Sequence, residues 1–192
     1  MTFDQLWRFA QEEAYLSNTT SESVFQSIGL RLEYPTNPWQ YYCTPRNTKT
    51  FASTGCDGVH YSFLESPVLL HSPIVMTVPM SFANPNIVVA ETLYEFLCLG
   101  CRTSYFALES LSSCDSDFDS LKSQDYAADL SDMQVGYLHK LSKTFGLFPY
   151  VTLEWRLAQL QSKYLDFLQM GEVERMSPKS VAPAAFTFGQ FA

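Results

Sequence analysis

The sequence has few basic residues and few histidines. Of its 192 residues, 12 are Lys or Arg, 20 are Asp or Glu and three are His, which gives a formal net charge of −8. Nucleic-acid binding depends on clustered Lys and Arg, and anionic membrane surfaces attract basic segments. The charge balance therefore disfavours nucleic acid and membrane as partners. A basic protein is the partner that it favours.

Export and membrane signals are also missing. The N-terminus, Met-Thr-Phe-Asp-Gln-Leu-Trp-Arg, has no basic region and carries charge where an export signal would be apolar. No apolar run reaches the length of about 20 residues that a membrane span needs. The five cysteines are odd in number and sparse. Because nothing marks the chain for export, we expect reduced thiols and a cytoplasmic location.

The familiar catalytic and cofactor motifs are absent from the sequence. It contains no G-x-G-x-x-G or G-x-x-x-x-G-K-[ST] phosphate loop, no G-x-S-x-G elbow and no H-E-x-x-H zinc motif. Cys98 and Cys101 have the spacing of half a zinc site, but no second pair matches them. Buried thiols that act as small apolar side chains explain this pair better.

An acidic stretch imitates the start of a calcium loop. Asp115, Asp117 and Asp119 alternate as in an EF-hand, but Ser120 replaces the required Gly and Tyr126 stands where the bidentate Glu belongs. Carboxylates at a helix start account for the stretch, because they favour the positive end of the helix dipole. We therefore expect no metal site and no cofactor.

Apolar and aromatic residues are plentiful, at 46% and 15% of the chain, which excludes a disordered protein. Periodicity predicts helices over 3–16, 88–101, 132–144 and 152–170, and strands over 29–33, 48–53, 59–64 and 73–79. This order predicts an α+β fold in which an N-terminal helix and several C-terminal helices pack on a central antiparallel sheet. We expect one domain over 1–171 and a loose tail over 172–192.

The most informative segment is a hairpin over 48–64. Its turn, Gly55-Cys56-Asp57-Gly58, contains Asp-Gly, and Gly tolerates the positive φ of tight turns. Alternation along the second strand should direct Val59, Tyr61 and Phe63 toward the core. The opposite face should then carry the side chains of His60, Ser62 and Leu64.

Three patterns within residues 44–97 resemble the SUKH superfamily, which includes bacterial toxin-immunity proteins and a yeast cell-wall-synthesis regulator. They are the Thr-Gly-x-Asp-Gly-Val-His hairpin over 54–60, the Ser-Pro-Ile-Val strand over 72–75 and the Val-Ala-Glu-x-Leu-x-Glu-Phe-Leu helix over 89–97. The N-terminal helix also fits. The resemblance implies a non-enzymatic protein-binding fold, often an immunity protein that blocks a toxin.

On this interpretation, four residues are the predicted binding contacts. Asp57 and His60 belong to the hairpin, and Trp39 and Tyr41 belong to an aromatic, Pro-rich segment just before it. Trp and Tyr bring a large contact area with few rotatable bonds, which suits them to binding. The residues by themselves favour a turn-forming role for Asp57, a solvated or structurally hydrogen-bonded role for His60 and a core role for the aromatic residues.

Two other functions remain open from the sequence. A hydrolase or transferase could use His60 with Asp57 or Cys56, if these side chains meet in a pocket. A structural, self-associating protein could use the apolar stripe of the last helix, formed by Leu157, Leu160, Tyr164 and Leu168. Burial of that stripe within the chain would remove the basis for self-association.

Overall fold

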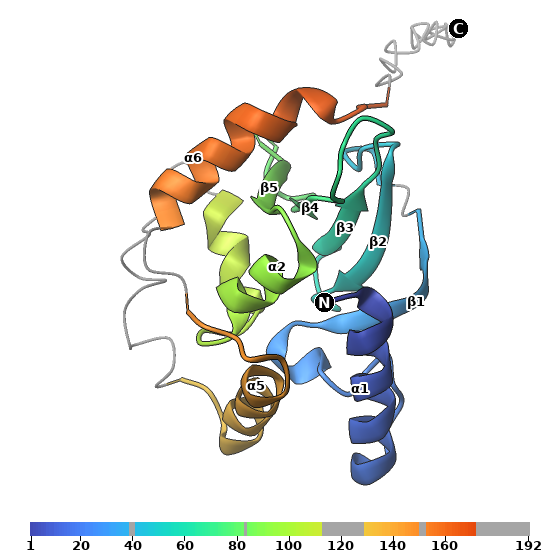
Figure 1. The fold of residues 1–192 in the computed structure, drawn as a ribbon, viewed down its shortest axis with the longest axis vertical. Coiled ribbons are helices and arrows are strands. Elements are labelled where there is room, and N and C mark those ends of the chain that lie inside the picture. The colour runs from blue at the N-terminus through green and yellow to red at the C-terminus, as the bar shows by residue number, and fades with distance from the viewer. Residues whose placement is uncertain (39–40, 83, 113–128, 150–152, 172–192) are drawn as a thin grey trace, which may run out of the picture.

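The computed structural model describes residues 1–38, 41–82, 84–112, 129–149 and 153–171, which form a five-stranded antiparallel sheet with helices around it (Figure 1). The strands follow one another across the sheet in chain order. They are β1 (Arg31–Asn37), β2 (Thr48–Ser53), β3 (His60–Leu64), β4 (Ile74–Thr77) and β5 (Asn86–Ala90). The expected α+β fold with a central antiparallel sheet is confirmed.

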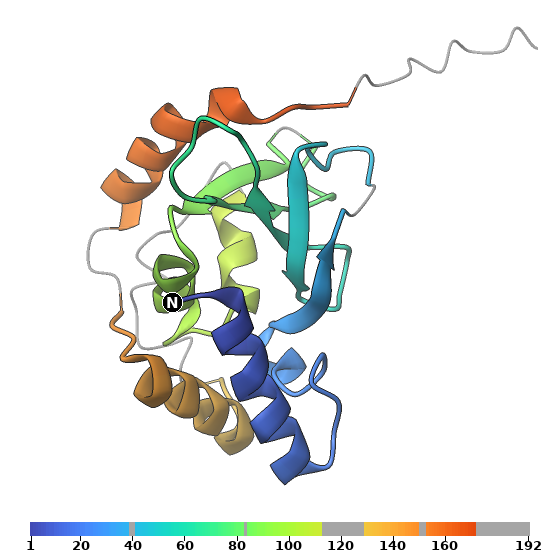
Figure 2. The same ribbon diagram turned by 45° about the vertical axis from the view of Figure 1, so that its right-hand side comes forward.

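The α-helices come before and after the strands. They are α1 (Phe3–Ser17), α2 (Leu93–Gly100), α5 (Asp132–Phe145) and α6 (Leu153–Tyr164), and the 3-10 helices are η1 (Gln26–Ile28), η2 (Phe106–Ser112) and η3 (Leu165–Phe167). Figures 1 and 2 show α1 and α5 close together at one end of the molecule and α6 at the other end, beside β5. No helix within the described ranges is long and apolar enough to cross a bilayer.

The helix expected over 88–101 is wrong in its first part. Residues 86–90 form the edge strand β5, and α2 begins only at Leu93. The run Ile87-Val88-Val89 explains the difference, because β-branched side chains favour strands. Thr92 then starts the helix, since its side chain accepts a hydrogen bond from the backbone N–H of Glu95.

The C-terminal helix is shorter than expected. The α-helix α6 ends at Tyr164, and the chain continues into η3. Three members of the predicted apolar stripe, Leu157, Leu160 and Tyr164, are at most 7% exposed, and Leu168, beyond the helix, is partly buried against the same core. Because β5 is among the elements that α6 packs against, the stripe gives no basis for self-association. The tail expected over 172–192 and the acidic stretch 115–119 lie outside the described residues.

One face of the sheet holds the aromatic core. The Phe51 ring on β2 stacks on Phe63 of β3 at 4.5 Å between centroids, and Phe96 of α2 packs edge-on against Phe51. Tyr61 of β3 is fully buried on the same face, and its hydroxyl donates to the backbone carbonyl of Tyr105 at 2.7 Å. Val59, Tyr61 and Phe63 therefore face the core, as the alternation predicts.

The opposite face is buried as well, and it is unusually polar. One row crosses all five strands through the register Arg31–Ser53–His60–Thr77–Asn86, and every member is polar. Cross-strand partners project from the same face of a sheet. The three central side chains of this polar row are at most 2% exposed. Such a buried row needs hydrogen-bond partners from a covering segment.

Residues 41–46 supply that cover, and we call them the strap. Thr44 Oγ1 lies 3.2 Å from His60 Nε2, and the Cys43 carbonyl accepts a hydrogen bond of 2.7 Å from the Asn86 side chain. Thr77 completes the network by donating to Asn86 Oδ1 at 2.8 Å. Hydrogen bonds thus hold the strap on the polar face, although the buried Ser53 hydroxyl has no partner among the described residues.

An ion-pair cluster fastens α6 to the segment that joins β5 to α2. Arg156 on α6 contacts Glu95 with Nε at 2.6 Å and Glu91 with Nη2 at 3.0 Å. Glu91 also accepts from Lys163 at 2.6 Å and from the Tyr164 hydroxyl. These contacts, those of Lys163 and Tyr164 first, lower the pKa of Glu91 to about 2.

Candidate functional site

The hairpin turn forms as the Asp-Gly pair predicts. Asp57 and Gly58 both have positive φ, at 50° and 73°, and the N–H of Val59 donates to the Cys56 carbonyl at 3.1 Å. Two central residues with positive φ define a type I′ turn, whose twist matches that of the flanking strands. Thr54 braces the turn, because its hydroxyl donates to the Cys56 carbonyl at 3.0 Å. Asp57 is therefore held on a rigid, exposed tip.

Next to the turn, His60 is a fully buried structural residue. Its Nδ1 lies 2.7 Å from the carbonyl of Gly58, and a carbonyl can only accept, so Nδ1 carries the proton. Nε2 then accepts from the hydroxyl of Thr44. Burial lowers the pKa of His60, which keeps the ring neutral, although the Gly58 bond opposes this effect. Both ring nitrogens thus make hydrogen bonds, one within the hairpin and one to the strap, and the ring has no exposed surface.

This role of His60 makes stability depend on pH. In the unfolded chain the imidazole takes up a proton below its ordinary pKa of 6.5, whereas the buried ring stays neutral to lower pH. The free energy of unfolding should therefore fall as the pH drops from 6.5, by at most about 1.4 kcal/mol per pH unit from this group. Urea denaturation between pH 7.5 and 5.5 measures the slope.

His60→Gln removes the titration and should flatten that slope relative to the wild type. His139→Gln, at an exposed position on α5, is the control and should keep the wild-type slope. Equal slopes for His60→Gln and the wild type would show that His60 is not held neutral in the folded protein.

Tyr41 forms the bridge between the buried His60 and the surface. Its ring stacks on the imidazole, with 5.6 Å between centroids, and is 42% exposed. A Cβ at Gly58 would lie 2.9 Å from this ring, so glycine there permits both the turn conformation and the close contact. Tyr41 and Asp57 both line a shallow depression of about 140 Å³, together with Arg31 and Ser53.

Glu109 on η2 is close enough to Asp57 for the two carboxylates to interact. The pKa of Glu109 on η2 is raised, first by burial and then by the nearby carboxylate of Asp57. The carboxylates of Asp57 and Glu109 therefore repel each other, although the two residues are 52 positions apart in the sequence. A cation placed between them would relieve this repulsion.

Exposed apolar side chains also lie on the strap and on the loop after β4. Tyr42 of the strap is 62% exposed, and its hydroxyl donates to the Pro79 carbonyl at 2.6 Å, which ties the strap to the loop after β4. In that loop Met80 is 66% exposed and Phe82 is 80% exposed. We call the group of Tyr41, Tyr42, Asp57, Met80 and Phe82 the hairpin-end surface. The pairing of His60 with Thr77 puts the loop after β4 at the same end of the sheet as the turn, and Tyr42 ties the strap to that loop.

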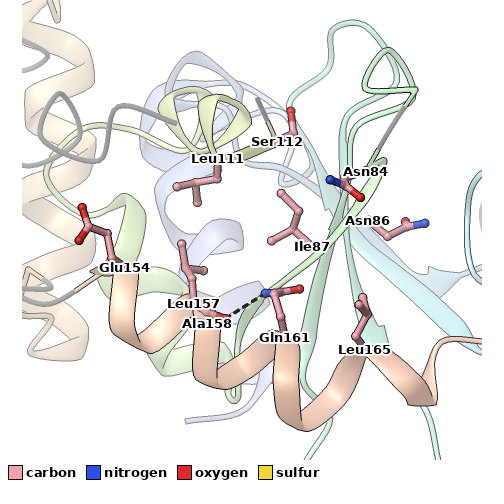
Figure 3. A pocket seen from close by; sticks show the side chains of 10 residues that line it. All are labelled: Asn84, Asn86, Ile87, Leu111, Ser112, Glu154, Leu157, Ala158, Gln161 and Leu165. Atoms are coloured by element: carbon pink, nitrogen blue, oxygen red, sulfur yellow. Dashed lines mark hydrogen bonds between the residues drawn. The ribbon is translucent and has the colours of Figure 1, made fainter. Parts of the chain in front are cut away.

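A separate groove runs along the edge of the sheet between β5, η2 and α6 (Figure 3). Its volume is about 560 Å³, which is within the range of sites that bind small molecules or peptide side chains. Apolar side chains form its middle and polar side chains its ends. Its lining residues are Asn84, Asn86, Ile87, Leu111, Ser112, Glu154, Leu157, Ala158, Gln161 and Leu165.

Gln161 gives this groove an unusual wall. Its Nε2 donates to the carbonyl of Val88 at 2.7 Å, and its Oε1 accepts from the N–H of Val88 at 3.0 Å. One side-chain amide thus occupies the place that a peptide group of a sixth strand would take. Edge strands expose such backbone groups and require cover. Gln161 provides that cover at Val88.

The four predicted contact residues differ in where they lie. The structure brings together Tyr41, Asp57 and His60, but it buries His60 beneath the Tyr41 ring. Trp39 lies outside the described residues. His60 presents its Nε2 to Thr44 and its Nδ1 to Gly58, which gives the hydrolase or transferase alternative no support. Among the described residues, no group of three His, Cys, Asp or Glu side chains could hold a metal ion.

Other parts of the surface were not anticipated from the sequence. The apolar loop between Pro79 and Pro85 carries a usable signal, because Met80 and Phe82 stand between prolines where a turn is expected. The groove gives no such signal, since its walls come from segments far apart in the chain. Comparisons with protein-family models, with curated proteins and with solved structures found no match to the chain.

Proposed function

We propose that this chain is a non-enzymatic, cytosolic protein-binding module, and that the hairpin-end surface is where it recognises its partner. The observation that carries the proposal is the exposure of Tyr42, Met80 and Phe82 beside a rigid turn. Exposed aromatic and methionine side chains that gather on one surface are typical of protein-binding sites. The hydrogen bonds that tie the strap and the turn in place reduce the entropy lost on binding.

The partner in this proposal is a basic protein. Asp57 is exposed at the turn, and the whole chain has a formal charge of −8, so a positive surface is attracted. The resemblance of residues 44–97 to the SUKH superfamily supports the same function. On that resemblance, the chain acts as an immunity-type protein that covers a functional surface of a toxin or another protein.

Reduced cysteines support the proposed cytosolic setting. The four cysteines among the described residues, Cys43, Cys56, Cys98 and Cys101, are all free. Burial raises the pKa of the Cys101 thiol to about 11, which keeps it protonated and unreactive. The buried Cys101 thiol therefore behaves as part of the fold, not as a nucleophile.

Affinity capture from the native lysate tests the proposal, with the full chain as bait. We expect a stoichiometric protein partner at low salt. Asp57→Lys should reduce its recovery at least about tenfold, because it places a like charge against the basic surface. The matched control is Asp132→Lys, an exposed change in the first turn of α5, which should leave recovery unchanged.

Two results would contradict the proposal. One is the absence of any stoichiometric protein at low and at high salt. The other is an equal loss of the partner with Asp57→Lys and Asp132→Lys, because both variants change the net charge equally but only one alters the hairpin-end surface.

A further inference from the structure

Among the described residues, no hydrogen bond reaches the outer side of the β5 edge at Asn86. Both backbone groups of Val88 point away from β4, because they bond to Gln161. In an antiparallel ladder, alternate residues face the same side, and the register Met76–Ile87 and Thr77–Asn86 is regular here. The backbone N–H and C=O of Asn86 therefore also point away from the sheet. Gln161 covers Val88, and the groove adjoins Asn86.

The walls of the groove suit the side chains of an added strand. In Figure 3 the side chains of Leu111, Leu157 and Ile87 converge on the middle of the groove, with Asn84 near one end and Glu154 at the other. Strand-addition sites combine an open backbone edge with pockets for alternate side chains. This groove offers both features within one volume of about 560 Å³.

Charge decides what kind of segment fits. Of the described residues that line the groove, Glu154 alone carries a formal charge, and it lies at one end. A bound segment with an uncharged middle therefore fits the groove. A basic residue at the Glu154 end of the segment complements the carboxylate, while an acidic residue there is repelled.

We propose that the groove binds an extended segment of a partner protein, which adds to the edge of β5 at Asn86. Its apolar side chains at alternating positions enter between η2 and α6, and a Lys or Arg lies toward Glu154. The inference goes beyond the proposed function, because it assigns a second surface and a different mode of recognition. Gln161 marks the end of the site, since its amide already occupies the next position along the edge.

A defined peptide tests this assignment on the full chain. The probe is fluorescein-labelled Lys-Val-Thr-Val-Thr-Val-Lys, with blocked ends, which carries a basic residue at each end and so fits either strand direction. Its binding is followed by fluorescence polarisation. Ala158→Trp fills the groove from an exposed position on α6 and should weaken binding at least about tenfold. Ser162→Trp, an exposed change on the same helix outside the groove, should leave binding unchanged.

N-methylation separates strand addition from simple apolar binding. One probe is methylated on its Val amides and a second on its Thr amides. Because alternate amides of an added strand face β5, one pattern should abolish binding and the other should retain it. Equal binding of both methylated probes, loss of both, insensitivity to Ala158→Trp, or no binding at 1 mM probe (a limit of about −4 kcal/mol) would overturn the assignment.

The peptide experiment and the capture experiment fail independently. Loss of the captured partner with Asp57→Lys depends on the hairpin-end surface, whereas the peptide contacts only the groove. A negative peptide result with a positive capture result removes the strand-addition site and leaves the proposed function standing.

Discussion

Arg156→Ala should lower the free energy of unfolding by about 3 kcal/mol. Arg156 is 18% exposed and Glu95 is 10% exposed, so removing the guanidinium leaves a largely buried carboxylate without its main counter-charge. Glu91 would lose one of its cationic partners in the same step. This cluster holds α6 against β5. The urea concentration at the midpoint of unfolding should therefore fall clearly. The helix α6, which forms one wall of the groove, should also detach from β5 more readily.

The surface pair Lys49–Glu65 is the matched control for this prediction. Both of its side chains are about half exposed, so Lys49→Ala should cost less than about 1 kcal/mol. Similar small effects of Arg156→Ala and Lys49→Ala would mean that the ion-pair cluster does not fasten α6. Glu91, with its pKa of about 2, adds a pH effect, since its contribution to stability is lost as the pH falls from 4.5 toward 2. Solvent screening limits that contribution to about 1 to 2 kcal/mol.

Combined loss of Tyr42 and Phe82 should weaken partner binding by about 100-fold or more. The two side chains are 62% and 80% exposed, so Tyr42→Ala and Phe82→Ala remove contact area for a partner while leaving the core intact. Binding of the captured partner to the full chain is measured by surface plasmon resonance. Tyr42→Phe keeps the ring but removes its hydrogen bond to Pro79, so it separates lost contact from a loosened strap.

Tyr15→Ala is the control for this pair of changes. Tyr15 is 88% exposed on α1 and is not part of the hairpin-end surface, so its loss should leave partner binding unchanged. A double variant of Tyr42 and Phe82 that binds as the wild type does would remove these residues from the recognition surface. The partner would then have to bind elsewhere on the chain.

Local chemistry made the hairpin predictable from the sequence. Asp-Gly between two strand-like runs predicts a tight turn, and the turn forms with positive φ at Asp57 and Gly58. The alternation of Val59, Tyr61 and Phe63 correctly predicts which side chains face the core. Both inferences need only neighbouring residues, because turn conformation and strand alternation are local properties.

The burial of His60 was beyond such local reasoning. Alternation places His60 on the face opposite the core, and that face would be solvated if nothing covered it. The strap covers it instead, through contacts between residues 16 to 43 positions apart, such as Thr44 with His60 and Cys43 with Asn86. A single sequence does not reveal that a Pro-rich loop folds back over a polar strand face.

The error at β5 has a similar cause. The apolar spacing over 88–101 matches a helix, but β-branched residues at its start form an edge strand when β4 is available as a partner. The groove depends on this strand and on Gln161, which is 73 positions away from Val88. Its walls could not be predicted from the sequence, because they exist only once α6 has packed beside β5.

The most direct test of the central claim is hydrogen–deuterium exchange of the full chain with and without its captured partner. The claim is that the hairpin-end surface recognises another protein. Amide exchange should slow in residues 41–46, 55–58 and 79–82 when the partner binds, and exchange in α1 and α5 should stay as it is in the free chain. Protection confined to α1 and α5, with unchanged exchange at the hairpin turn and the strap, would contradict the account.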